Sequence, residues 1–275
     1  MQSLIEDKSA MSNIHPTAVV DKGAEIGNVV EIGPFCVVGP NVKIGDNTVL
    51  HSHVSIAGHT TLGTGNEIFP YASLGHIPQD LKFNNEKSFL EIGNGNRIRE
   101  NVTINLGTEG GGGVTRVGNN GLFMVGAHVA HDCIVGDNIV MANNAALGGH
   151  VEVEDNVIFG GFSAIHQFSK AGKYSFIGAG AMVISNVIPF GTVMGNRAYL
   201  AGLNLVGLKR ANFNREDIHS LRNAYKLLFS SVDEDILGER VQQAEEEFGK
   251  TPLVKDLLSF IKSIDKRGIC LPQQN

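Results

Sequence analysis

The segment IGNVVEIGPFCVVGPNVKIGDNTVL, residues 26–50, carries an aliphatic side chain at every sixth residue. Four of the five aliphatic residues in this register are followed directly by glycine, as in Ile26-Gly27 and Ile44-Gly45. A period of six fits neither an amphipathic helix nor a long alternating strand. It indicates short strands joined by tight corners, three hexads to a coil, in which glycine is expected to supply backbone angles that other residues adopt at a cost.

The same register extends through most of the chain. Apolar residues recur six apart over residues 14–74 and 92–104 and, after a slip of one residue, over residues 117–183, which makes 26 core positions. Four residues after each core position the side chain is usually small, as at Cys36, Thr48 and Ala127. Both rows are expected to point into the coil. We therefore predict an all-β fold, a left-handed parallel β-helix over residues 14–200, the handedness being that of the motif class.

Two segments interrupt the coil, and the period changes near the end of the chain. The excursions are residues 75–91 and 106–116, and insertions in a solenoid are exposed and often carry binding residues. A small C-terminal helical domain is predicted over residues 212–275. Asn214 should cap its first helix, residues 236–248 should form a second, and Thr251-Pro252 should start a third that ends at Gly268.

Composition excludes several classes of protein. The chain has 275 residues, 42% hydrophobic and 18% charged, with a net charge of −6, which argues against disorder and against nucleic acid as a partner. It contains no apolar run long enough to span a membrane, and its acidic beginning does not resemble a signal peptide. Three cysteines do not make a disulfide framework. The expected location is the cytoplasm.

Four histidines, His128, His131, His150 and His166, lie within three coils. None occupies an inward row, so all four should decorate the outer face. His131 and His150 are one coil plus one residue apart, which should bring them near each other beside Asp132. A neutral imidazole oriented by a carboxylate can act as a general base near pH 7. A zinc site built from these histidines is the competing interpretation.

Six segments together resemble the UDP-N-acetylglucosamine O-acyltransferase family, whose reaction is the first step of lipid A biosynthesis. They are IHPTAVVDKGAEIG (residues 14–27), PQDLKF (78–83), GAHVAHDC (126–133), GGHV (148–151), AIHQF (164–168) and GLKR (207–210). The resemblance covers about residues 14–268. It implies transfer of a 3-hydroxyacyl group from acyl carrier protein to the 3-position of the sugar of UDP-N-acetylglucosamine, without metal or cofactor, by a homotrimer with sites between subunits.

The resemblance also implies roles for individual residues. His131 would be the general base, Asp132 would orient it, and the backbone N–H of Gly149 would donate to the developing oxyanion. Ala179 would end the groove that measures the acyl chain and would favour chains of about 12 to 14 carbons. The residues implied in substrate binding are Gln79, Asp80, Lys82, His128, His150, His166, Gln167, Asn204 and Arg210.

Departures from the family pattern leave alternatives open. Asn105 stands where a histidine is common, and Val206 and Ala211 stand where charged residues are common. These positions concern the nucleotide and sugar, so a sugar with a 3-amino group is an alternative acceptor. Two alternatives of another class are a zinc hydro-lyase like the gamma-type carbonic anhydrase and a non-catalytic hexapeptide scaffold. The cations Lys209, Arg210, Arg215, Arg222 and Lys226 suit either a diphosphate or the acidic acyl carrier protein.

Overall fold

A computed structural model describes residues 12–230, 237–264 and 267–273. The chain forms two compact units, residues 1–139 (unit 1) and 140–275 (unit 2). Short parallel strands stack into three sheets, and four helices follow them toward the C-terminus. This is the predicted parallel β-helix. Each unit is described by itself below.

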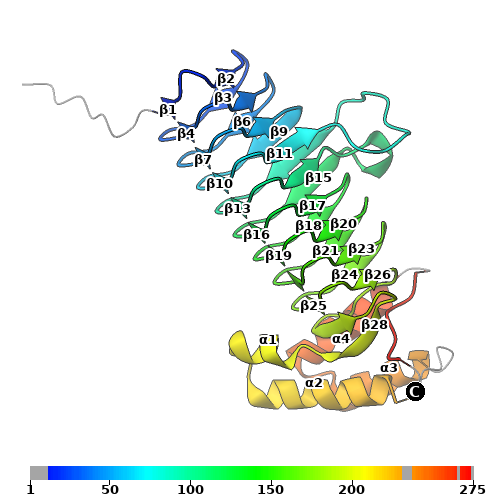
Figure 1. Cartoon of the computed structure of the whole chain (residues 1–275). Helices are drawn as coiled ribbons and strands as arrows, with labels where there is room; N and C mark the ends of the chain where they lie inside the picture. Colours follow the sequence, from blue (N-terminus) through cyan, green and yellow to red (C-terminus); the bar gives the residue numbers. More distant parts are fainter. Residues whose placement is uncertain (1–11, 231–236, 265–266, 274–275) are drawn as a thin grey trace, which may run out of the picture. The chain divides into compact units, whose positions relative to one another are not determined.

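Unit 1 is built from strands β1 to β18, most of them two residues long, which are stacked coil upon coil (Figure 1). The first sheet contains β1 (Asn13–Ile14), β4 (Glu31–Ile32), β7 (Val49–Leu50), β10 (Glu67–Ile68), β13 (Arg97–Ile98) and β16 (Leu122–Phe123). The second contains β2 (Val19–Val20), β5 (Val37–Val38), β8 (Ser55–Ile56), β11 (Ser73–His76), β14 (Thr103–Asn105) and β17 (His128–Val129). The third contains β3 (Glu25–Ile26), β6 (Lys43–Ile44), β9 (His59–Leu62), β12 (Phe89–Ile92), β15 (Val114–Val117) and β18 (Ile134–Val135).

The register of the coils explains the six-residue period. In the first sheet Ile32 pairs with Leu50, and Leu50 pairs in turn with Ile68. Each core position therefore lies directly over the equivalent position of the next coil. From Ile32 onward every core position is at most 4% exposed, whereas Ile14 in the first coil is 43% exposed because only one neighbouring coil covers it.

Glycine directly after a core position allows the next coil to pack closely against the backbone. A Cβ on Gly63 would lie 2.2 Å from Asn94 Oδ1 and 2.7 Å from the carbonyl oxygen of Gly93. Neither Gly27 nor Gly63 has a positive φ, so the expectation that these glycines supply unusual backbone angles was wrong for them. The left-handed angles fall further along the corner, for example at Asn47 (φ 58°) and His53 (φ 60°). Tight stacking, and not corner geometry, selects glycine there.

Both excursions leave unit 1 at neighbouring coils. The first runs between β11 and β12 and the second between β14 and β15, so the loops are shorter than the sequence pattern indicated. A short 3-10 helix, Glu109–Gly111, lies in the second loop. The Glu86 carboxylate of the first loop accepts a hydrogen bond from the Glu109 N–H at 3.3 Å. The two loops lie side by side next to β11 and β15 (Figure 1).

Unit 2 continues with further short strands and ends in helices. Its parallel strands are β19 (Val140–Met141), β20 (Ala146–Leu147), β21 (Glu152–Val153), β22 (Ile158–Phe159), β23 (Ala164–Ile165), β24 (Lys170–Ala171), β25 (Phe176–Ile177) and β26 (Met182–Val183). Strands β27 (Gly191–Met194) and β28 (Tyr199–Leu203) form an antiparallel hairpin. The helices are α1 (Leu205–Arg210), α2 (Arg215–Leu228), α3 (Leu237–Phe248) and α4 (Pro252–Ser263), and α2, α3 and α4 pack against one another (Figure 1).

The helix signals in the sequence were mostly reliable. The Asn214 side chain accepts a hydrogen bond from the Glu216 N–H, which confirms the predicted cap of α2, and Pro252 begins α4. The predicted end of this last helix at Gly268 was wrong, because α4 ends at Ser263, where Ile264 takes up an extended conformation. Ile236 lies outside the described residues. Helix α1 was not anticipated, and in the described part of the chain no helix is long and apolar enough to cross a membrane.

Removal of one core side chain should destabilise the coil far more than removal of its outward neighbour. Leu62 is 1% exposed, whereas the adjacent Thr61 is exposed. Leu62→Ala should lower the free energy of unfolding by about 2–5 kcal/mol, because it leaves a cavity between close-packed coils. Thr61→Ala should change it by about 0.5 kcal/mol or less. Urea denaturation of both variants measures the difference, and equal losses would contradict the inward–outward assignment.

Candidate active site

A histidine–aspartate pair lies at the corner between β17 and β18. His131 Nδ1 is 2.7 Å from Asp132 Oδ2, and the Asp132 side chain is 0% exposed against 14% for His131. Asp132 has a φ of 60°, which turns the chain sharply at this point. Its N–H donates to Thr115 Oγ1 at 2.8 Å, which fixes the turn against β15. The corner thus buries the carboxylate and leaves the imidazole at the surface.

Thr108 of the second excursion fixes the Asp132 carboxylate. Its N–H donates to Oδ1 at 2.7 Å, and its hydroxyl donates to Oδ2 at 2.6 Å. A Cβ on Gly111 would lie 2.0 Å from Asp132 Cγ, so only glycine fits at that point. The glycine-rich loop therefore folds closely over the carboxylate. The sequence patterns did not single out Thr108, Gly111 or Thr115, which lie in or next to the second excursion.

The geometry of the pair fixes which ring nitrogen of His131 can accept a proton. A carboxylate only accepts hydrogen bonds, so His131 Nδ1 carries the hydrogen in this contact. In the neutral ring the second nitrogen, Nε2, is then the proton acceptor. A buried carboxylate against Nδ1–H also stabilises the imidazolium that forms after proton transfer. The arrangement can remove a proton from a hydroxyl or an amine.

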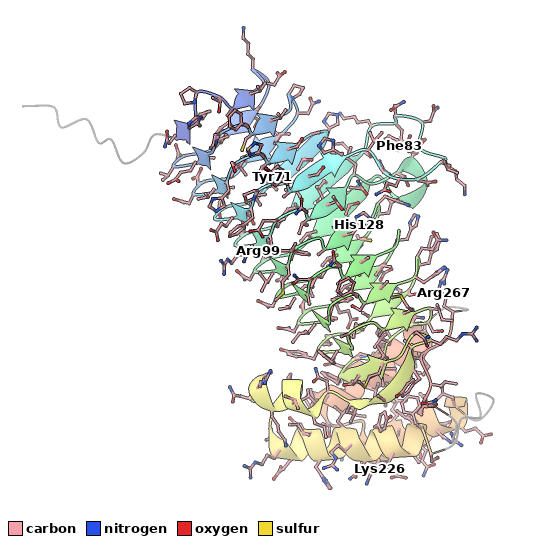
Figure 2. The ribbon with its side chains drawn as sticks, viewed as in Figure 1. Tyr71, Phe83, Arg99, His128, Lys226 and Arg267 are labelled. Atoms are coloured by element: carbon pink, nitrogen blue, oxygen red, sulfur yellow. The ribbon has the colours of Figure 1, made fainter. Side chains whose placement is uncertain are left out.

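A second histidine of unit 1, His128, lies on the outer face of the second sheet (Figure 2). Its Nδ1 is 2.7 Å from Thr103 Oγ1 on the neighbouring coil. Burial lowers the pKa of His128, an effect that a hydrogen bond with the Thr103 backbone opposes and that the nearby His131 reinforces. Burial also lowers the pKa of His76 on the same sheet, whose Nε2 is 2.9 Å from Ser55 Oγ. Both rings are therefore neutral hydrogen-bonding groups near pH 7.

The first excursion carries three of the anticipated substrate-binding residues. Gln79 and Lys82 are exposed, and Asp80 is half-buried and accepts a hydrogen bond from the Lys82 N–H at 3.0 Å. Asn105, at the base of this loop, is only 7% exposed, and its amide contacts the carbonyl oxygen of Ile77 at 3.3 Å. Asn105, which stands where the family commonly has histidine, therefore helps to anchor the start of the first excursion.

In unit 2 the anticipated residues occupy the corners of three further coils. Gly149 is buried, and His150 stacks on Phe168 with ring centroids 4.3 Å apart and planes 8° apart. His166, Gln167 and Ala179 are exposed. Gly160 packs closely against the backbone of Ala179 on the next coil. A Cβ on Gly160 would lie 2.5 Å from the Ala179 nitrogen, so the position favours glycine.

The helical part of unit 2 contributes Asn204 and Arg210. Both ends of the Asn204 amide are used within the fold, since Oδ1 accepts from the Gly207 N–H and Nδ2 donates to the Tyr174 carbonyl oxygen. Arg210 is exposed in the last turn of α1. A cavity of about 650 Å³ between α1 and α2 is lined by Lys209, Asn212, Phe213, Arg215, Ile218, His219 and Arg222. The charged residues of this lining are all basic. Lys209, Arg215 and Arg222 were noted in the sequence as a cluster of cations, but the cavity between them was not predicted.

Comparisons with known proteins agree with this architecture. Residues 186–270 match the family model described as UDP N-acetylglucosamine O-acyltransferase, domain 2, and residues 23–58 match the bacterial transferase hexapeptide model. The chain is 49% identical to the acyl-[acyl-carrier-protein]–UDP-N-acetylglucosamine O-acyltransferase of Aliarcobacter butzleri, over 94% of this chain and 98% of the relative. It is 52% identical to the enzyme of that name from Paracoccus denitrificans, over 74% and 77% respectively. The structure of LpxA from Acinetobacter baumannii superposes with a TM-score of 0.90 at 42% identity, covering 94% of this chain and 99% of that one.

The lowered pKa of His128 predicts a pH-dependent contribution to stability. The unfolded chain, with an ordinary histidine pKa of about 6.5, takes up protons before the folded state does, so stability should fall as pH drops below about 6.5. His128→Gln removes this difference in proton uptake, so the variant should lose less stability between about pH 7.5 and pH 5.5 than the unaltered protein. Urea midpoints of the variant and of the unaltered protein at about pH 7.5 and pH 5.5 measure it. An identical loss in both proteins would contradict the assignment.

Proposed function

The chain belongs to the acyl-[acyl-carrier-protein]–UDP-N-acetylglucosamine O-acyltransferase family, and we propose that it transfers the acyl group by general-base catalysis at His131. The reaction of this acyltransferase is the first step of lipid A synthesis. The observation that carries the proposed mechanism is the His131–Asp132–Thr108 chain of hydrogen bonds. It holds Nε2 of the base in the state that accepts a proton.

The transfer is proposed to proceed in two steps. The 3-hydroxyl oxygen of the sugar attacks the thioester carbonyl carbon while its proton moves to His131 Nε2. The C–S bond then breaks, and the leaving sulfur takes the proton from the imidazolium. The products are an acylated sugar nucleotide and a carrier with a free thiol. The Asp132 carboxylate accepts the Nδ1–H bond and stabilises the transient imidazolium.

The backbone N–H of Gly149 is proposed to stabilise the oxyanion. Gly149 is buried at a coil corner, directly before His150, and its carbonyl oxygen accepts a hydrogen bond from the Phe168 N–H at 3.0 Å. This bond holds the backbone at Gly149 in place. A preorganised donor of this kind contributes most when negative charge develops on the carbonyl oxygen.

The substrates are proposed to meet polar groups at the coil corners, in the first excursion and at the two ends of α1. For UDP-N-acetylglucosamine these are Gln79, Asp80, Lys82, His128, His150, His166, Gln167, Asn204 and Arg210. The basic cavity between α1 and α2 is proposed to meet the acidic acyl carrier protein. Lys209, Arg215 and Arg222 form no ion pair with any residue of the described chain, so their charge is available to a partner.

A homotrimer is proposed, with the outer face of the second sheet in unit 1 as the interface between subunits. Val19 and Val37 are 63% and 48% exposed on consecutive coils. Beside them the rings of Phe35, His53 and Tyr71 form a ladder with centroids 5.0 Å apart at each step, and Phe35 and Tyr71 are 56% and 59% exposed. Contiguous apolar surface of this kind is typical of an interface between subunits. A cytoplasmic location stays a prediction from sequence.

Loss of the base should abolish most of the activity. His131→Ala should reduce turnover by about 10²–10⁴-fold, the range expected for a positioned general base. The assay is incubation with UDP-N-acetylglucosamine and a panel of 3-hydroxyacyl carrier protein thioesters, with the acylated product measured by mass spectrometry. His15→Ala, at an exposed histidine of the first coil, is the matched control. Near-normal turnover of folded His131→Ala protein would refute the base assignment.

A charge on the exposed aromatic ladder should disrupt assembly. Tyr71→Glu would place a carboxylate beside His53 on the proposed interface, and burying that unpaired charge on assembly is costly. Sedimentation should then show a smaller species than the trimer of the unaltered protein. Glu239→Lys, on an exposed face of α3, is the control that should leave the mass unchanged. A trimeric Tyr71→Glu variant would exclude this face as the interface.

The acyl-chain preference should depend on Ala179. Compared with glycine, Ala179 adds one methyl group to the end of the acyl groove. It should therefore weaken binding of the longest chain by the free energy of burying one methylene, ~0.8 kcal/mol, or about fourfold. The unaltered protein should prefer chains of about 12 to 14 carbons with modest discrimination. Ala179→Met should shift the preference to shorter chains, as measured by competition between thioesters. An unchanged preference would show that Ala179 does not measure the chain.

A further inference from the structure

The C-terminal segment, residues 267–271, returns to the coils of unit 2 and is held there by backbone hydrogen bonds. The buried Asn186 donates to the Gly268 carbonyl oxygen from its N–H and from its Nδ2, at 3.1 and 2.8 Å. Cys270 N–H donates to the Asn186 carbonyl oxygen at 2.8 Å, and Leu200 N–H donates to that of Leu271 at 2.9 Å. Ile269 and Cys270 are 7% and 4% exposed. The segment therefore has a defined path along the coil.

This path places Arg267 against two aromatic residues of the candidate site. Its guanidinium carbon is 5.6 Å from the Phe168 ring centroid, and the same ring stacks on His150. Its Nη1 is 3.2 Å from His166 Nδ1. Arg267 is labelled in Figure 2 at the edge of these coils. No sequence pattern connects Arg267 with His166, because 101 residues separate them.

The contact with Arg267 decides the tautomer of His166. The His166 Nδ1 atom has two neighbours at 3.2 Å, Arg267 Nη1 and the Gln167 carbonyl oxygen. A guanidinium only donates and a carbonyl only accepts, so the two contacts require opposite states of Nδ1. The charge-assisted bond is the stronger, and the guanidinium is always protonated. His166 Nδ1 therefore accepts from Arg267, and the ring hydrogen resides on Nε2.

We propose that Arg267 is a positioning residue for the acyl transfer, which holds the ring hydrogen of His166 on Nε2, as a hydrogen-bond donor to an acceptor oxygen of the sugar nucleotide. The inference rests on the proposed function in taking His166 as a substrate-binding residue. Without Arg267, Nδ1–H would turn to the Gln167 carbonyl oxygen and Nε2 would become an acceptor. His166 would then present a lone pair where the substrate needs a donor.

Three substitutions separate this role from a merely structural one. Arg267→Met keeps a long side chain against Phe168 and removes the donor, whereas Arg267→Lys and Arg267→Gln each keep an N–H group that can donate to His166 Nδ1. In Arg267→Met the KM for UDP-N-acetylglucosamine should rise about tenfold, the value of one lost hydrogen bond, while kcat changes by about twofold or less. Lysine should restore most of the affinity.

The second readout is the tautomer of His166, measured from the ¹⁵N chemical shifts of histidine-labelled protein without substrate. The unaltered, lysine and glutamine proteins should carry the hydrogen on Nε2, and Arg267→Met should carry it on Nδ1. The His131 signals should not change in any variant. If the methionine variant does not fold, the glutamine and lysine variants still test the tautomer, since both should carry the hydrogen on Nε2. His166→Phe, which lacks this ring, identifies the His166 signals.

Two results would overturn the proposal: an unchanged His166 tautomer in Arg267→Met, or a hydrogen on Nδ1 in the unaltered protein. An unchanged KM in Arg267→Met would overturn the link to substrate. Failure of the proposed function itself looks different, because then no acylated sugar nucleotide forms in the unaltered protein, whatever the tautomer of His166.

Discussion

Stacking of equivalent residues on consecutive coils is the constraint on which the rest of this structure depends. Because Ile32, Leu50 and Ile68 lie directly over one another, a residue's place in its hexad decides whether it points into the coil or out of it. Parallel strands about 4.8 Å apart bring consecutive corners close together, and at Gly63 a Cβ would collide with Asn94 and Gly93 of the next coil. The same rule turns His128 and His131 outward.

The His131–Asp132 pair shows how a rigid coil is joined to an irregular loop. The corner at Asp132 buries its carboxylate, and a buried charge needs hydrogen-bond donors. Thr108 supplies two of them from the second excursion, and Gly111 lets the loop come close enough to do so. The loop thus helps to hold Asp132, and through it the His131 ring. In unit 2 the C-terminal segment plays a similar supporting role, because it places Arg267 next to His166.

The sequence predicted the coil well because its signal is local and repeated many times. The direction of each histidine and the caps at Asn214 and Pro252 followed from short-range rules. The supports of the site could not be predicted in this way. Thr108 lies 24 residues from Asp132, and Arg267 lies 101 residues from His166, so no spacing rule connects them. The four glycines of the second loop do not indicate what Gly111 contacts, because only the folded chain brings it against Asp132.

The central claim is that His131 Nε2 is the atom that receives the proton of the acceptor hydroxyl. A crystal structure of the protein with UDP-N-acetylglucosamine bound measures it most directly, through the distance from Nε2 to the 3-oxygen of the sugar. The account predicts a hydrogen-bond distance of about 2.6–3.2 Å, with Nδ1 still bound to Asp132. A sugar whose 3-oxygen contacts a different basic group, with His131 outside hydrogen-bonding reach, would contradict it.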